Sequence, residues 1–396
     1  MNSSVRIASA ILLLSLQVCS AQGISEHRQV AGSDHDFMMV EYYCISGTNR
    51  EIGKSIAHLA KERGVPVAVP GDSLRTRLRY EYFRTEYPEL YRRMVGVAEE
   101  YGISPTDFSR DASILPYMPT KGGCSVVFYP SDRTASGHNI VSRNLDMPID
   151  GGMSHSTMFT RPIVFEVHPD SGYPCIYLSA DDLLGGATEG INSRGLCVAV
   201  LGTESADYAH HTPEPSYEVG LSEFVIVRYL LDRCGTIDEA RQSLLRSKQF
   251  YRNFQLHYVV ADSSGKSFIF QFSRHRNQSR IVDGKGIQFV TNHLLAVADT
   301  LDAPLESVER FNILKSLLRD DRRFNAAEID RISSSVSPWM PSYVPPWPGS
   351  RTLWHSVYDL NMRTLRVKFY LGESRDTSNL SRIITNYSSY ADFQLN

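Results

Sequence analysis

A cysteine preceded by two glycines has the setting in this chain best suited to covalent chemistry. Cys124 follows Gly122 and Gly123 and opens the apolar run Ser125–Tyr129. Cleavage of the bond between Gly123 and Cys124 would give one residue both a thiol nucleophile and an α-amine. The reference pKa of such an amine is roughly 7.7–8.0, which suits a base near neutral pH. We therefore interpret the chain as a zymogen that activates itself by autoproteolysis.

The two apolar runs after this cysteine predict a hairpin. Ser125–Pro130 and His138–Met147 flank a short linker rich in turn residues, a pattern typical of two antiparallel strands. If the turn is centred near Thr134, the register places Cys124 opposite about Asn144. The hairpin therefore returns the second run to the side of the thiol.

This register brings two charged residues close to the cysteine. Arg143 could lower the pKa of the thiol through its charge, and Asp146 could hold the α-ammonium group. The two positions point to opposite faces of a regular strand, so both reach one site only if the strand bulges or ends there. A surface ion pair on a hairpin is the alternative.

Further polar residues close apolar runs or lie in an expected helix. Asn292 ends a strand-like run, where it could form a turn or donate to an oxyanion. Losing an oxyanion donor costs roughly 3–4 kcal/mol of transition-state stabilisation. Asn192 with Gly195 suits a tight turn, and an amide donor or substrate contact is the alternative. Arg310 lies near the start of an expected helix, where a solvent-exposed arginine is the alternative to a site residue. For His293, we favour a structural role over a catalytic dyad with Cys124.

Other catalytic signatures do not occur in the sequence. We find no metal-binding cluster, His-Glu-x-x-His motif, phosphate-binding glycine loop or Gly-x-Ser-x-Gly elbow, so no metal or cofactor is expected. A papain-type thiol protease would place its cysteine at the start of a helix, whereas Cys124 begins a β-run. Cys124 is therefore the only strong nucleophile candidate.

The beginning of the chain has the features of a secretory signal. Arg6 precedes the apolar segment Ile7–Val18, and small residues follow up to Ala21, after which we expect cleavage. This pattern predicts a secreted or periplasmic protein. No later apolar run is long enough to span a bilayer, so stable membrane insertion is not expected. The 41 basic and 44 acidic residues give a net charge of −3, which argues against nucleic acid as a partner.

The cysteine count leaves one thiol unpaired. Removal of a signal ending at Ala21 leaves five of the six cysteines, an odd number. If Cys124 is the free thiol, the other four could form up to two disulfides, or they could be buried thiols. These four are Cys44, Cys175, Cys197 and Cys234.

The elements that must position these residues change character at Cys124. Before it, the pattern predicts helices over Glu51–Ala60, Thr76–Tyr87 and Glu89–Tyr101. After it come short β-runs with helices at about Ser216–Asp232, Ile237–Ser247 and Leu305–Leu318. This order favours an α+β fold with sheet packed on sheet. The β-runs are Ser125–Tyr129, His138–Met147, Ile163–His168, Gly195–Leu201, Gln255–Ala261, Phe268–Phe272, Ile287–Thr291, Leu353–Asp359 and Thr364–Tyr370.

The order of these motifs resembles the N-terminal nucleophile (Ntn) hydrolases. The similarity is closest to the acyl-coenzyme A:isopenicillin N acyltransferase-like branch, which is related to choloylglycine hydrolase and penicillin V acylase. The motifs that carry the resemblance are Glu51–Gly53, Tyr87–Leu90, Gly123–Cys124, Arg143–Asp146, Glu189–Leu196, Ala261–Gly265, Thr291–His293 and Ser307–Arg310.

The resemblance implies a four-layer αββα sandwich with an N-terminal helical region. It implies a signal peptide over 1–21, a small chain over 22–123 and a catalytic core over 124–396, the two chains staying associated after cleavage. Homo-oligomerisation is left open. The implied catalytic residues are the nucleophile Cys124 and the residues around it, namely Arg143, Asp146, Asn192, Asn292 and Arg310.

The implied activity is hydrolysis of a non-peptidic linear amide, an N-acyl amine or N-acyl amino acid. The substrate would be a small molecule, and its acyl and amine parts do not follow from the resemblance. One alternative is an acyltransferase that uses the same thioester. An alternative of another class is a secreted binding protein in which Cys124 stays uncut.

Overall fold

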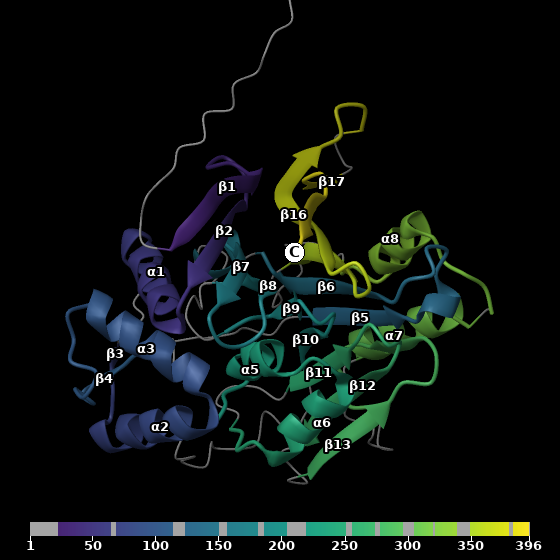
Figure 1. Cartoon of the computed structure of the whole chain (residues 1–396). Helices are drawn as coiled ribbons and strands as arrows, with labels where there is room; N and C mark the ends of the chain where they lie inside the picture. The colour runs from purple at the N-terminus through teal and green to yellow at the C-terminus, as the bar shows by residue number, and fades with distance from the viewer. Residues whose placement is uncertain are drawn as a thin grey trace, which may run out of the picture.

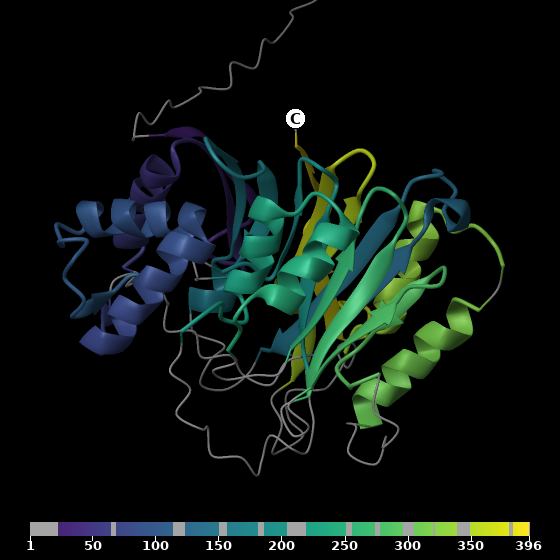
Figure 2. The same ribbon diagram turned by 60° about the horizontal axis from the view of Figure 1, so that its bottom comes forward.

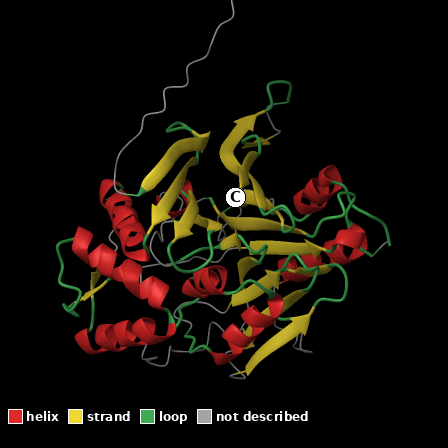
Figure 3. Ribbon diagram, viewed as in Figure 1, coloured by secondary structure: helices red, strands yellow, loops and turns green. Residues whose placement is uncertain are grey.

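Two β-sheets stacked face to face form the centre of the molecule, and helices cover their outer faces (Figure 1, Figure 3). One apolar cluster lies between the sheets, and one lies between each sheet and the helices on its outer side. The expected αββα sandwich is confirmed. The computed structural model describes residues 23–64, 69–113, 123–149, 157–180, 186–203, 219–250, 256–273, 278–295, 305–319, 321–338, 349–379 and 383–395.

The larger sheet has nine strands and includes two from the N-terminal segment. All its neighbouring strands are antiparallel except one pair, β2 and β7. In spatial order the strands are β1 (Ile24–Gly32), β2 (Met39–Gly47), β7 (Ile163–Pro169), β8 (Cys175–Ser179), β9 (Glu189–Asn192), β10 (Cys197–Gly202), β11 (Leu256–Ala261), β12 (Ser267–Ser273) and β13 (Gln278–Asp283).

The second sheet has seven antiparallel strands and carries Cys124 near the start of an inner strand. A separate pair of two-residue strands, β3 (Val69–Pro70) and β4 (Arg110–Asp111), lies among the N-terminal helices. The strands of the second sheet are β14 (Gln288–Val290), β5 (Gly123–Tyr129), β6 (Ile140–Pro148), β15 (Ser350–Asp359), β16 (Thr364–Arg375) and β17 (Ile383–Tyr387), with β18 (Ala391–Gln394) also paired to β16.

The helices form the two outer layers. Figure 2 shows α5 (Val225–Arg233) and α6 (Ile237–Arg246) on one side of the sheets, and α7 (Leu305–Leu317) and α8 (Ala326–Ser335) on the other. No helix among the described residues is long and apolar enough to cross a membrane. The remaining helices are α1 (Asn49–Glu62), α2 (Ser73–Glu86), α3 (Pro88–Glu100), the short α4 (Thr157–Thr160) and the 3-10 turn η1 (Ser131–Arg133).

Strand β5 is buried on both faces because it lies between two apolar layers. Cys124, Val126 and Phe128 face the other sheet, whereas Val127 and Tyr129 face α7 and α8. A strand buried on both sides reads as a continuous apolar run, which is why the sequence signals it clearly. The nucleophile candidate therefore points into the layer between the sheets.

The three helices predicted before Cys124 are confirmed as α1, α2 and α3, but the segment is not helical throughout. It also supplies β1 and β2, which the sequence did not indicate. Most side chains of β1 are exposed and polar, so this edge strand lacks the apolar alternation that would identify it. Capping signals mark the helices better, as in the capping box of Thr48 and Glu51 at the start of α1.

A buried ionic cluster joins the N-terminal helices to the part of the chain after Cys124. Asp232 on α5 accepts from Arg93 on α3 at 2.6 Å, from Arg228 at 3.1 Å and from the hydroxyl of Tyr87. Arg93 also donates to Asn49 on α1. Burial alone would raise the pKa of Asp232, but Arg228 and Arg93 together hold it below its usual value. The carboxylate therefore stays ionised between two buried guanidinium groups.

Replacing this carboxylate should destabilise the fold strongly. We expect Asp232→Asn to lower the free energy of unfolding by about 3–5 kcal/mol, because two buried guanidinium groups lose their counter-charge. Thermal melting of the folded variant measures the loss. Asp238→Asn on α6 is the control, since that side chain is exposed and should cost under about 0.5 kcal/mol. Equal melting temperatures for the two variants would contradict the role of the cluster.

Candidate active site

Cys124 lies opposite Leu145 in the β5–β6 hairpin, one residue from the predicted register. The hairpin prediction is therefore confirmed. The side chain is 5% exposed and faces the layer between the sheets. The peptide bond from Gly123 is part of the described chain, so the geometry around Cys124 is that of an intact chain.

Arg143 approaches the thiol from the same face of the hairpin. Its Nη2 lies 3.8 Å from Sγ of Cys124 and donates to the carbonyl of Val200 at 2.9 Å. Its Nη1 forms an ion pair with Glu189, a fully buried residue of β9 that also accepts from the hydroxyl of Ser356. The guanidinium is thus fixed from the opposite sheet, and its charge is compensated.

Arg310 approaches the other side of the same strand, where it contacts the main chain rather than the thiol. Its Nη1 donates to the carbonyl of Cys124 at 3.0 Å and to Oδ2 of Asp146 at 3.1 Å. The second oxygen of Asp146 accepts from the hydroxyl of Thr352 at 2.6 Å. Asp146 pairs in register with Gly123, directly beside the bond proposed to break.

The strand alternation predicts opposite faces for Arg143 and Asp146, and the structure confirms it. No bulge of β6 is needed to bring both to the site. Arg143 contacts the thiol of Cys124. Asp146 is bonded to Arg310, which donates to the main-chain carbonyl of Cys124. Arginine side chains therefore contact Cys124 from both faces of strand β5.

Asn292, which follows β14, holds the main-chain nitrogen of Cys124. Its Oδ1 accepts from the N–H of Cys124 at 2.8 Å and from Nη2 of Arg310 at 2.7 Å. Its Nδ2 donates to the carbonyl of Gly202 at 2.7 Å, and its own N–H donates to the hydroxyl of Ser307 at 2.8 Å. Because an amide nitrogen carries two protons, Nδ2 has a second proton available for a substrate oxygen.

Gly123 is confined by the same residues. A Cβ at this position would lie 3.1 Å from Nη2 of Arg310 and 3.3 Å from Cβ of Asp146. These distances are tighter than ordinary van der Waals contact, so a side chain would displace the ionic pair. The glycine before Cys124 therefore allows the pair to approach the main chain closely.

The electrostatic surroundings leave the thiol of the uncut chain protonated at neutral pH. Burial raises the pKa of Cys124; the charge of Arg143 opposes this and that of Asp146 adds to it. Burial likewise raises the pKa of Asp146, opposed by Arg310. A reaction of this thiol therefore needs a base, or a route that transfers its proton during attack.

The structure does not join Asn192 to this constellation. Its Nδ2 donates to the carbonyls of Leu231 and Cys234, and its Oδ1 accepts from the N–H groups of Arg194 and Leu196. These partners use both amide protons and both acceptor positions of the side chain. In this structure Asn192 thus serves the turn before β10, the structural alternative considered for it.

The side-chain contacts of His293 are with residues other than Cys124. Its Nδ1 lies 2.9 Å from the hydroxyl of Ser307, and its ring packs on the edge of Phe311. Burial and the charge of Arg310 lower its pKa. This supports the structural role over a dyad with Cys124.

Three supporting residues were missed by reasoning from the sequence. Glu189, Ser307 and Thr352 anchor Arg143, Asn292 and Asp146 respectively. Glu189 and Ser307 lie in motifs that carry the family resemblance but were given no role, and Thr352 lies outside those motifs. The five cysteines among the described residues are all free thiols, so the alternative of disulfides among Cys44, Cys175, Cys197 and Cys234 is not observed.

Stacked sheets between helical layers, with a cysteine at the start of an inner strand, define the class of Ntn hydrolases. Residues 133–376 match the sequence model of the acyl-coenzyme A:6-aminopenicillanic acid acyl-transferase family, and the chain belongs to this family. The match begins after Cys124 and covers Arg143, Asp146, Asn292 and Arg310. The resemblance inferred from the sequence is confirmed.

Individual relatives are more distant. The chain is 31% identical over 129 residues to a penicillin V acylase of Pectobacterium atrosepticum, covering 30% of this chain and 32% of that protein. It therefore spans about a third of the length of that relative. The penicillin V acylase structure from Agrobacterium tumefaciens aligns with 62% of this chain and 82% of its own, at 18% identity and a TM-score of 0.41. A mutant conjugated bile acid hydrolase from Clostridium perfringens aligns with 67% and 96%, at 14% identity and a TM-score of 0.45.

The charge of Arg143 should control the reactivity of the thiol. Because this charge lowers the pKa of Cys124, Arg143→Gln should raise that pKa and slow alkylation by iodoacetamide several-fold at pH 7. The full pH profile of alkylation should move to higher pH. The measurement is made in a Cys44→Ser background, because Cys44 is the partly exposed thiol.

Arg143→Lys is the matched control, since it keeps the positive charge while losing the planar fork. Its profile should stay closer to that of the parent. An unchanged profile in folded Arg143→Gln would show that the guanidinium does not act on the thiol.

Proposed function

We propose that this protein is an exported, self-activating cysteine Ntn hydrolase that cleaves a non-peptidic linear amide through an acyl-thioester on Cys124. One observation carries the proposal: the thiol, N–H and carbonyl of Cys124 are each held by a different polar side chain. These side chains are Arg143, Asn292 and Arg310. A merely structural cysteine in a strand would not need its own main chain bonded to side chains from two other segments.

Activation would begin with attack of the Cys124 thiol on the carbonyl carbon of Gly123. The peptide C–N bond breaks, the thiol proton passes to the departing nitrogen, and a thioester forms. Water then opens the thioester, leaving a carboxylate on Gly123 and a free thiol and α-amine on Cys124. The contact of Oδ1 of Asn292 with the Cys124 nitrogen supports this step, because it already holds the group that becomes the amine.

Turnover would use the new amine as the base that the buried thiol lacks. The amine takes the thiol proton, sulfur attacks the substrate carbonyl, and the leaving amine receives the proton. The second proton on Nδ2 of Asn292 is suited to stabilise the oxyanion, together with a main-chain N–H. Water releases the acyl group and restores the free thiol.

Acyl transfer is the second candidate, favoured by the description of the matched family as an acyl-transferase. In this variant an amine replaces water in the last step, and the same residues serve. The penicillin V acylase relative favours hydrolysis instead. Product analysis with and without a competing amine distinguishes the two, since transfer gives a new amide and hydrolysis a free acid.

Several observations support association of the two chains after cleavage. The parallel pair β2–β7 joins the small chain to the large one within a single sheet, and the buried contact of Arg93 with Asp232 spans the same boundary. Export rests on the sequence before Gln22, which lies outside the described residues. The class of N-acyl amine or N-acyl amino acid remains the proposed substrate.

A release assay over a panel of N-acyl amides tests the activity. Wild-type protein should release the amine from at least one substrate, and mass spectrometry should find the acyl adduct on the peptide that contains Cys124. Cys124→Ala should reduce release to background, whereas His27→Gln, at a partly exposed residue of β1, should retain it. A protein that shows no turnover, no acyl adduct and an unreactive Cys124 would instead support the secreted binding protein.

A further inference from the structure

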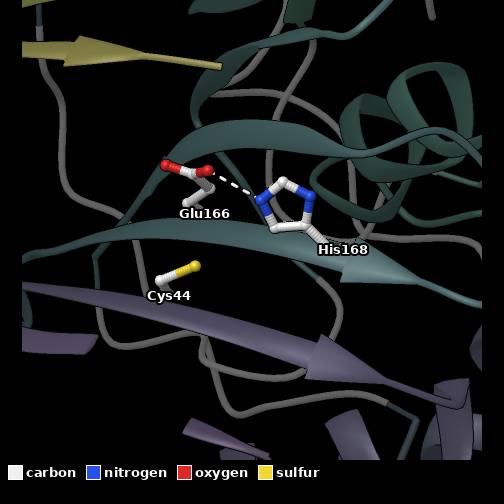
Figure 4. Close-up of side chains that lie close together, drawn as sticks. All are labelled: Cys44, Glu166 and His168. Atoms are coloured by element: carbon white, nitrogen blue, oxygen red, sulfur yellow. Dashed lines mark hydrogen bonds and ion pairs between the residues drawn. The ribbon is translucent and has the colours of Figure 1, made fainter. Parts of the chain in front are cut away.

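A second group of reactive side chains lies on the nine-stranded sheet, where the N-terminal segment meets the catalytic part. Cys44 on β2 is in register with Glu166 on β7, and Ser46 is in register with His168 two residues further. Because side chains alternate along a strand, Glu166 and His168 project from the same face as Cys44. Figure 4 shows the three side chains turned toward one another.

The three ligand-type atoms are close enough to share one ion. The sulfur of Cys44, a carboxylate oxygen of Glu166 and a ring nitrogen of His168 all lie within 4.8 Å of one another. Nε2 of His168 is 2.6 Å from Oε1 of Glu166, and the hydroxyl of Tyr42 donates to Oε2 at 2.7 Å. Glu166 is 8% exposed, and the other two ligands are half-buried, so the group is sheltered but reachable.

We propose that Cys44, Glu166 and His168 form a binding site for a divalent zinc-type metal ion. One thiolate, one imidazole and one carboxylate suit zinc, whereas calcium and magnesium require oxygen ligands. Ligands about 2.0–2.3 Å from a tetrahedral zinc lie roughly 3–4 Å apart, so small rotations of these side chains suffice. The fourth position is left to water.

Tyr42 completes the site as an outer partner. Its hydroxyl fixes one oxygen of Glu166 and leaves the other turned toward His168. Such outer hydrogen bonds orient metal ligands and commonly change metal affinity by about 10- to 100-fold. A plain ion pair of Glu166 with His168 would need neither this orientation nor a thiol beside it.

No sequence motif indicates this site, because its ligands come from two distant segments. Glu166-x-His168 is the only local pattern, and Cys44 joins it solely through the parallel pairing of β2 with β7. The expectation that the chain binds no metal followed from spacing along the sequence alone.

The position of the site gives the metal a structural task. Cys44 precedes the proposed cleavage point, and Glu166 and His168 follow it. The ion would therefore hold the small chain and the large chain together after cleavage, a consequence that rests on the proposed function. The binding site itself does not depend on cleavage.

Cobalt titration of the full-length Cys124→Ala chain tests the site, because this variant lacks the catalytic thiol and should stay uncut. After treatment with a chelator, Co²⁺ should bind at one ion per chain and give the near-ultraviolet band of a thiolate–cobalt bond. Zinc should displace it. Cys44→Ser should abolish the band, His168→Gln should weaken binding strongly, and Tyr42→Phe should weaken it about tenfold or more.

His27→Gln is the matched control, because this histidine of β1 also pairs with a glutamate but has no part in the group. It should bind cobalt as the parent does. Absence of the band in the parent, or a band that survives Cys44→Ser, would overturn the site. In the cleaved wild-type protein, a chelator should ease separation of the chains. Separation that the chelator does not affect would overturn only the role of the ion in holding the chains together.

Discussion

The guanidinium of Arg310 is the group on which the geometry of the candidate active site depends. It is buried, and it donates to the carbonyl of Cys124, to Asp146 and to Asn292 at 2.7–3.1 Å. A buried cation is costly unless it is paired, and Asp146 supplies the opposite charge. The carbonyl of Cys124 and Oδ1 of Asn292 accept two further N–H groups. Arg310 thereby fixes the main chain of Cys124 and the side chain of Asn292, which accepts from the nitrogen of Cys124.

A second guanidinium performs the matching task on the opposite face. Arg143 belongs to the seven-stranded sheet and Glu189 to the nine-stranded sheet, so their ion pair joins the two sheets at the level of the thiol. The thiol therefore lies at a fixed point between the sheets. Each arginine is paired with its own carboxylate. The pKa of Cys124 is raised because the effect of burial outweighs the opposing charge of Arg143.

How much of this site the sequence reveals depends on how local each signal is. The hairpin that brings Arg143 and Asp146 to Cys124 follows from two apolar runs and one turn, so its register was predicted within one residue. Arg310 and Asn292 come from distant segments. The local sequence left Asn292 open between an oxyanion donor and a turn, and only the family resemblance pointed to Arg310.

Other features leave no local trace. Asn192 sits in a motif that also satisfies a tight turn, and only its four hydrogen bonds distinguish the two roles. The exposed polar strand β1 lacks an apolar pattern. The grouping of Cys44 with Glu166 arises only from strand pairing across the sheet.

The mass and N-terminal sequence of the purified protein test the central claim most directly, namely that Cys124 becomes the first residue of a catalytic chain. The large chain should begin Cys-Ser-Val-Val-Phe and span residues 124–396, about 31 kDa by proportion of the 44.6 kDa chain. Cys124→Ala should remain a single uncut chain. An active wild-type protein whose bond between Gly123 and Cys124 is intact would contradict the account.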